Sequence, residues 1–158
     1  MPLRAVVGIG ANLGDRLATM RRAVRRIEDE VGRVEARSRA YETAPVGGPV
    51  QPSFLNAAVL VTFDGTPLEL LDRLLGIEVS LGRVRAERWG PRVIDLDLLW
   101  IDGVAVDVPR LTVPHPRLRE RAFAVRPLLD VAPEARDPVS GAAYRVPAGD
   151  LHDAGEGL

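Results

Sequence analysis

The hydrophobic pattern of this chain changes its period several times, and these changes constrain the fold more than any other feature. Short β-branched runs predict strands, whereas apolar residues spaced three and four positions apart predict helices. In order, the pattern predicts a strand over 3–9, a helix over 16–31, strands over 34–41 and 54–63, a helix over 67–81 and a strand over 93–101. Extended segments up to residue 116, helical turns over 117–131 and a weakly patterned tail follow.

Local end signals support both long helices. Asp15 can cap the first helix and Gly32 can end it, while Thr66-Pro67-Leu68-Glu69 is a capping box with proline at the first helical position. The resulting β-α-β-β-α-β order predicts an α+β fold of the ferredoxin-like type. We expect an antiparallel four-stranded sheet with both helices on one face, followed by a C-terminal extension. The other face is then available for a ligand or for the extension.

Composition limits the classes of function. A chain of 158 residues fits one compact domain, which we place over 1–158, and a net charge of −1 argues against binding nucleic acid through bulk charge. All 21 basic residues are arginine, which excludes mechanisms that need a lysine, and the absence of cysteine excludes disulfides and thiolate chemistry. No run approaches the ~20 apolar residues of a membrane span. We therefore expect a cytoplasmic monomer that binds neither nucleic acid nor membrane.

Two aspartates interrupt the apolar strand in the segment RWGPRVIDLDLLW, residues 88–100. Side chains two positions apart share a strand face, so we expect one face with Val93, Asp95, Asp97, Leu99 and Ile101 and the other with Ile94, Leu96, Leu98 and Trp100. The two carboxylates would repel by about 2–3 kcal/mol at an effective dielectric of about 20. Ion pairs with Arg88 and Arg92 could offset this repulsion, and so could Mg²⁺ that also binds phosphate oxygens.

Three further segments hold residues that are unusual for their expected local structure. Glu78 lies on or beside the apolar stripe of its helix, which suggests either a salt bridge to the following loop or a ligand contact. That loop, RVRAERWGPR over 83–92, holds four arginines and Trp89, which either anchors the loop on the core or closes a phosphate-binding site. The segment GIGANLGDR over 8–16 lacks both the Walker and the Rossmann spacing, so we interpret its glycines as a tight β-to-α turn.

The segment TAPVGGPVQPSFLN, residues 43–56, is long for a connection between strands, and long proline-stiffened loops often bind ligands. Phe54 and Asn56 share a strand face and could serve either the core or a flat heterocycle. His115 stands between two prolines near several arginines, so it is either structural or a phosphate contact.

Taken together, these segments resemble the 6-hydroxymethyl-7,8-dihydropterin pyrophosphokinase family of folate biosynthesis. The resemblance runs from Val7 to about Pro133 and is carried by GIGANLGD, YETAPVGGPVQPSFLNAAV, IEVSLGRVR, RWGPRVIDLDLL and RLTVPHPRLRERAFAVRPL, in the family's order. It implies a ferredoxin-like fold with the active site across the sheet, and transfer of pyrophosphate from ATP to the pterin hydroxymethyl group, leaving AMP.

The resemblance also implies site residues. Asp95 and Asp97 would hold two Mg²⁺ ions, and the charge stabilisers would be Arg83, Arg85 and Arg92. The ATP site would comprise Glu78, Arg83, Arg85, Arg88, Trp89, Arg92, Leu98, Thr112, His115 and Arg121. The pterin pocket would comprise Thr43, Pro45, Val46, Phe54, Asn56 and Phe123, with Phe54 and Phe123 enclosing the ring.

Two other classes of function fit parts of the pattern. A regulatory ferredoxin-like module would bind a small molecule without turnover, with arginine-paired aspartates and no Mg²⁺ dependence. An RNA-binding sheet would need outward aromatics on its central strands and a basic surface, and neither is evident.

Overall fold

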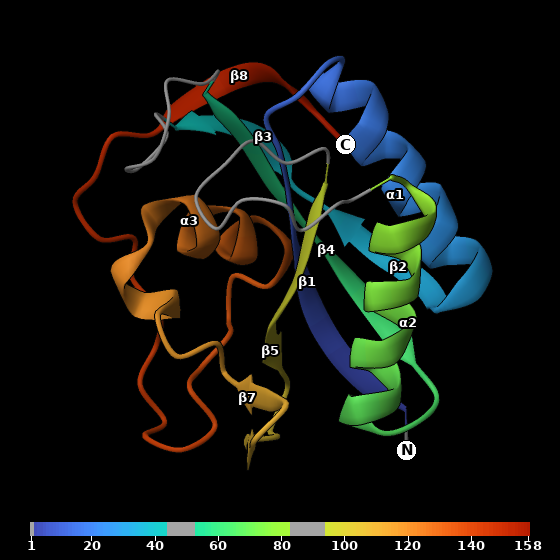
Figure 1. Ribbon diagram of the computed structural model, residues 1–158. Coiled ribbons are helices and arrows are strands. Elements are labelled where there is room, and N and C mark those ends of the chain that lie inside the picture. Colours follow the sequence, from blue (N-terminus) through green and yellow to red (C-terminus); the bar gives the residue numbers. More distant parts are fainter. Residues whose placement is uncertain (1, 44–52, 83–93) are drawn as a thin grey trace.

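The computed structural model describes residues 2–43, 53–82 and 94–158. The elements, in chain order, are β1 (Leu3–Ala11), α1 (Arg16–Glu30), β2 (Gly32–Arg37), β3 (Arg39–Thr43), β4 (Phe54–Phe63), α2 (Pro67–Ser80), β5 (Asp95–Ile101), β6 (Val106–Val108), β7 (Leu111–Val113), the 3-10 turn η1 (Leu118–Glu120), α3 (Ala122–Val131) and β8 (His152–Gly157) (Figure 1).

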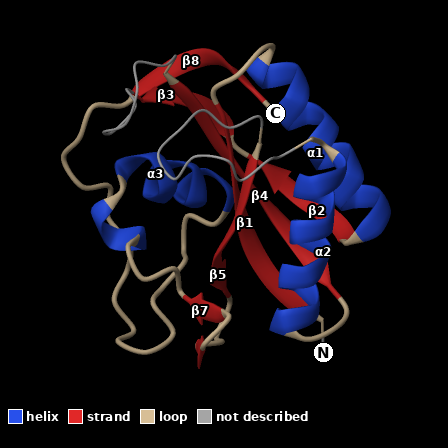
Figure 2. Ribbon diagram, viewed as in Figure 1, coloured by secondary structure: helices blue, strands red, loops and turns tan. Residues whose placement is uncertain are grey.

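The main sheet is antiparallel and has the strand order β5-β1-β4-β3-β8, with β2 pairing to β4 beside β3. Helices α1 and α2 cover one face of this sheet, and α3 lies against the other (Figure 2). The fold combines helices with an antiparallel sheet, as expected. The assignment of this fold to the ferredoxin-like type stays a prediction. The prediction of four strands was wrong, because β8 from the tail adds a strand to β3 and the expected second strand is divided in two.

Each face of the sheet has its own apolar cluster. The α1–α2 side is filled by alternate residues of β1, such as Val7 and Ile9, together with Met20 and Leu74 from the helices. The α3 side is filled by Val6, Leu60, Leu99, Trp100, Val125 and Leu128, among others. The second face is therefore partly covered by α3. No helix in the described ranges is long and apolar enough to cross a membrane.

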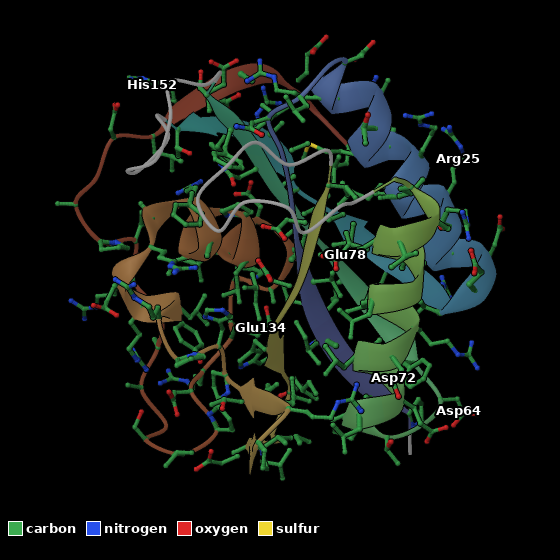
Figure 3. All side chains as sticks on the ribbon, viewed as in Figure 1. Arg25, Asp64, Asp72, Glu78, Glu134 and His152 are labelled. Atoms are coloured by element: carbon green, nitrogen blue, oxygen red, sulfur yellow. The ribbon has the colours of Figure 1, made fainter. Side chains whose placement is uncertain are left out.

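Both predicted helix starts are confirmed. The Asp15 carboxylate accepts the Ala18 N–H at 3.1 Å, which caps α1. Thr66 and Glu69 form the reciprocal capping box, with the Glu69 N–H donating to Thr66 Oγ1 at 3.2 Å and the Thr66 N–H donating to Glu69 Oε1 at 3.0 Å. These caps fix the register of α2, which places Glu78 on the side of the helix that faces the sheet (Figure 3).

The predicted continuous strand over 34–41 breaks at Ser38. The Ser38 hydroxyl accepts the Ala58 N–H at 2.7 Å, and the Ser38 N–H donates to the Ala58 carbonyl at 2.9 Å. A serine side chain thus takes the place of a backbone acceptor, which lets the chain pass from β2 into β3 without leaving a buried amide unpaired. The alternating pattern did not predict this break, because Ser38 fits the apolar side of the alternation.

The assignment of faces along β5 was wrong at its end. The pairing of β5 with β1 shifts register between Val6 and Val7, so Val7 pairs with Leu98 and Val6 with Trp100. Leu99 is the extra residue of this bulge, and a bulge reverses the alternation beyond it. Trp100 therefore packs on the α3 side and Ile101 on the α1–α2 side, opposite to the prediction.

Candidate active site

Asp95 and Asp97 lie on β5, on the face of the sheet where α3 packs. Asp95 is half-buried and Asp97 is exposed, whereas the intervening Leu96 is buried in the core. Their partners across β1 are glycines, because Gly10 pairs with Asp95 and Gly8 with Asp97. The two carboxylates thus share one face of an edge strand, as predicted. The neighbouring strand β1 has only glycines opposite them.

A cross-strand row connects the aspartates to the predicted pterin pocket. Gly10 pairs with Asn56 on one side and with Asp95 on the other, so these three residues lie side by side. A Cβ atom added at Gly10 would lie 3.5 Å from Asn56 Oδ1 and 3.9 Å from Asp95 Cβ. Gly8 and Gly10 therefore belong to β1, which corrects their assignment to a tight turn. Because residue 10 is glycine, β1 places no side chain between the Asn56 amide and the Asp95 carboxylate.

Thr43 and Asn56 are brought together at the start of the long loop. Asn56 is buried, and its Nδ2 donates to Thr43 Oγ1 at 3.1 Å and to the Tyr41 carbonyl at 3.4 Å. Thr43 pairs directly with Phe54, which is half-buried. Three of the six residues predicted for the pterin pocket thus lie together on β3 and β4.

Arg16 ties together the two strand ends that flank this loop. Its Nη2 donates to Glu42 Oε1 at 2.8 Å, and its Nη1 donates to the Ser53 carbonyl at 2.9 Å. Glu42 precedes the last residue of β3 and Ser53 precedes the first residue of β4. One guanidinium therefore binds the residues on both sides of the 44–52 connection. Arg16 and Glu42 are 26 positions apart, so a local sequence pattern could not predict their contact.

His115, Arg121 and Phe123 come from the segment that leads into α3. The His115 N–H donates to the carbonyl of the bulged Leu99 at 2.9 Å, and the Arg117 N–H donates to His115 Nδ1 at 3.3 Å. Since Nδ1 accepts, the neutral ring carries its proton on Nε2. Burial first, and then the positive charges of Arg121 and Arg117, lower the pKa of His115. The Arg121 guanidinium lies over the Phe123 ring, 5.6 Å from its centroid.

Glu78 is a buried carboxylate that binds the backbone of β5. It is 2% exposed, and its Oε2 accepts the N–H of Leu96 at 2.7 Å. Leu96 is the residue between Asp95 and Asp97, so Glu78 holds the segment that carries the aspartate pair. This hydrogen bond to a strand amide differs from both predicted contacts of Glu78, a salt bridge and a ligand contact.

Two other predicted ATP residues are not on the aspartate face of the main sheet. Leu98 packs in the cluster beneath α1 and α2, so its side chain lies on the opposite face from the aspartates. Thr112 is exposed on β7, where it pairs with Asp107. The predicted residues Pro45, Val46, Arg83, Arg85, Arg88, Trp89 and Arg92 lie outside the described residues.

The donor set suits Mg²⁺ better than a metal that needs a full protein cage. Within 2–43, 53–82 and 94–158, no cluster of three or more histidine, aspartate or glutamate side chains could hold a metal ion. Mg²⁺ is commonly held by one or two carboxylates together with substrate phosphates. A pair of carboxylates on one strand face therefore fits Mg²⁺ that arrives with a phosphate ligand.

Comparisons with known proteins identify close relatives of this chain. The family model described as 7,8-dihydro-6-hydroxymethylpterin-pyrophosphokinase (HPPK) matches residues 6–133. The chain is 48% identical over 132 residues to a protein of Methylorubrum extorquens named 2-amino-4-hydroxy-6-hydroxymethyldihydropteridine pyrophosphokinase, covering 83% of this chain and 84% of that protein. It is 39% identical over 137 residues to the protein of that name from Synechocystis, covering 87% and 70%.

Solved structures agree on the fold. A crystal structure described as HPPK-DHPS in complex with substrates superposes with a TM-score of 0.70 at 15% identity, covering 90% of this chain. The chain spans 42% of that longer protein. The likeness at this identity concerns the fold alone.

Proposed function

The chain belongs to the 7,8-dihydro-6-hydroxymethylpterin-pyrophosphokinase family, and we propose that it transfers pyrophosphate from ATP to the hydroxymethyl group of 6-hydroxymethyl-7,8-dihydropterin in folate biosynthesis. The products are AMP and the pterin pyrophosphate. We further propose that residues 1–158 form one catalytic domain that works as a cytoplasmic monomer.

The reaction forms one bond and breaks another. The hydroxyl oxygen of the pterin bonds to the β-phosphorus of ATP, the bond from that phosphorus to the oxygen bridging the α-phosphate breaks, and AMP leaves with that oxygen. The hydroxyl proton passes to solvent. Catalysis of such a transfer depends mainly on positioning and on stabilising charge, so the protein must align a hydroxyl with a phosphate chain.

Asp95 and Asp97 are proposed to hold two Mg²⁺ ions, which supply charge neutralisation for the phosphates. Asp97 is exposed and Asp95 half-buried, so both can reach a ligand above the sheet. The observation that carries the proposal is the row Asn56–Gly10–Asp95. It places an amide suited to the polar edge of a pterin beside a carboxylate suited to the metal, with no side chain between them.

The other residues divide between the two substrates. Thr43, Asn56 and Phe54 on the sheet and Phe123 on α3 are proposed to bind the pterin, together with Pro45 and Val46. His115 offers its Nε2–H to a phosphate oxygen, and Arg121 adds a positive charge nearby. The remaining proposed ATP contacts are Glu78, Leu98, Thr112, Arg88 and Trp89, with Arg83, Arg85 and Arg92 as charge stabilisers; Leu98 can contribute only backbone atoms on the aspartate side.

An assay that identifies the nucleotide product tests this function. The protein is mixed with Mg²⁺, ATP and 6-hydroxymethyl-7,8-dihydropterin, and nucleotides are separated by chromatography. We expect AMP that accumulates only when the pterin is present. ADP as the product, or no pterin-dependent turnover, would contradict the proposal.

Two aspartate-to-alanine variants, one at the proposed metal site and one control, test the metal assignment. Asp97→Ala should lose turnover and the Mg²⁺ dependence of ATP-analogue binding while its thermal unfolding stays that of the wild type. Asp72→Ala is the control, since Asp72 is an exposed aspartate on α2 that pairs with Arg110. Turnover of Asp97→Ala equal to that of Asp72→Ala would rule out the assignment.

A further inference from the structure

The Tyr41 hydroxyl forms a buried polar contact between the sheet and α3. Tyr41 lies on β3 and is 5% exposed. Its hydroxyl donates to Asp130 Oδ2 at 2.6 Å and accepts from Arg126 Nε at 3.3 Å. Both partners are on α3, 89 and 85 residues further along the chain. Most buried hydroxyls have hydrogen-bond partners, and both partners of this one are on the same helix.

Asp130 ties α3 to β3 a second time. Its Oδ2 also accepts the backbone N–H of Arg39 at 3.3 Å, and its Oδ1 lies 3.4 Å from Arg126 Nη2. The Asp130 carboxylate thus accepts hydrogen bonds from a hydroxyl and a backbone amide and forms an ion pair with a guanidinium. Hydrogen bonds to an ionised acceptor are shorter and stronger than neutral ones, so this group resists sliding of α3 over the strand.

The helix that this group holds also carries Phe123. Phe123 and Asp130 are seven residues apart, close to two helical turns, so they lie on the same side of α3 about 10 Å from each other. Pro127 lies between them and has no N–H to donate to the Phe123 carbonyl. The first turn of α3 therefore lacks one internal hydrogen bond, and its position depends more on external contacts such as the one at Asp130.

The strand that the group holds carries the opposite side of the proposed pterin pocket. Tyr41 pairs with Asn56, and its carbonyl accepts from Asn56 Nδ2 at 3.4 Å. Thr43 follows two residues later and accepts from the same amide at 3.1 Å. Tyr41 is thus bonded through its backbone to the sheet side of the pocket and through its hydroxyl to the helix that carries Phe123.

We propose that Tyr41 is a positioning residue for the pterin, whose hydroxyl bond to Asp130 fixes the separation between Thr43 and Asn56 on the sheet and Phe123 on α3. The proposal rests on the proposed function, because it concerns the pterin side of that site. It predicts a defect mainly in pterin binding, since Asp95 and Asp97 lie on β5 and the His115 N–H is bonded to Leu99 of the same strand.

Two tyrosine-to-phenylalanine variants test the proposal. Tyr41→Phe should raise KM for the pterin about tenfold, while KM for ATP and kcat at saturating pterin stay within about twofold of wild type. Tyr144→Phe is the matched control, because Tyr144 is also 5% exposed and packs on the same side of the sheet. Its hydroxyl has no hydrogen-bond partner among the described residues, so its loss should leave both KM values unchanged.

Variants of the partner carboxylate separate positioning from general stability. Asp130→Asn keeps a carbonyl acceptor for the hydroxyl and should retain most of the pterin affinity, whereas Asp130→Ala should resemble Tyr41→Phe. The double variant Tyr41→Phe/Asp130→Ala should be no worse than Asp130→Ala alone. A pterin KM in Tyr41→Phe equal to that of Tyr144→Phe, or an equal rise in KM for ATP, would overturn the proposal. Absence of turnover in the wild type would instead overturn the proposed function.

Discussion

Removal of the Glu78 carboxylate should loosen the strand that carries the aspartate pair. Strand β5 ends the sheet on one side, so the outward N–H of Leu96 faces α2 rather than another strand. Glu78 accepts that N–H at 2.7 Å and is 2% exposed. In Glu78→Ala the amide would remain buried without its acceptor.

The structure sets the size of the effect. An unsatisfied buried donor costs about 1–3 kcal/mol, and the space left by the truncated side chain adds to this cost. We expect the free energy of unfolding to fall by about 3 kcal/mol, which corresponds to about 6–12 °C in Tm for a domain of this size. Glu78→Gln keeps a carbonyl acceptor and loses only the charge, so its cost should be about 1 kcal/mol.

Thermal unfolding and hydrogen exchange provide the assay. The Leu96 amide should exchange faster in Glu78→Ala than in the wild type, and Glu78→Gln should be intermediate. Val79→Ala is the control, because Val79 is the next residue on the helix and is 72% exposed. If Glu78→Ala melts within about 2 °C of Val79→Ala and the Leu96 amide keeps its protection, the assigned role of Glu78 is wrong.

Three further variants have equally definite outcomes. Gly10→Ala should fold normally, because 3.5 Å from the added Cβ to Asn56 Oδ1 is an ordinary van der Waals contact. The methyl group would stand between the Asn56 amide and the Asp95 carboxylate, so the pterin KM should rise about tenfold or more; an unchanged KM would count against the pocket. Ser38→Ala should lower the unfolding free energy by about 1–3 kcal/mol in denaturant titrations, since the Ala58 N–H loses its acceptor; a loss below about 0.5 kcal/mol would contradict this. His115 has a lowered folded pKa, so its protonation favours the unfolded state and stability falls as pH drops below about 6.5. The stability of wild type relative to His115→Gln should therefore be greater at about pH 8 than at about pH 5, and equal differences would contradict the assignment.

The parts of the fold that depend on local pattern could be predicted from sequence. The caps at Asp15 and at Thr66–Glu69 and the strand over 54–63 are present as expected. The aspartates share a face because the alternation holds up to Leu98. Local geometry determines each of these features, so a short window of sequence contains the information.

The features that were missed depend on contacts between distant segments. The bulge at Leu99 arises from pairing with β1, and the extra strand β8 arises from pairing of the tail with β3. The bond between Tyr41 and Asp130 joins residues 89 positions apart. One signal was available, because Gly8 and Gly10 are two positions apart and therefore share a strand face. Their placement in a turn obscured their relation to Asn56 and Asp95.

The most direct test of the central claim is to follow the phosphates of ATP. Two reactions with Mg²⁺ and the dihydropterin are run in parallel, one with ATP radiolabelled at the α-phosphate and one with ATP radiolabelled at the γ-phosphate. Transfer of pyrophosphate predicts that the α label appears in AMP and the γ label in the pterin product. Recovery of the α label in ADP, or a γ label that reaches only inorganic phosphate, would contradict the account.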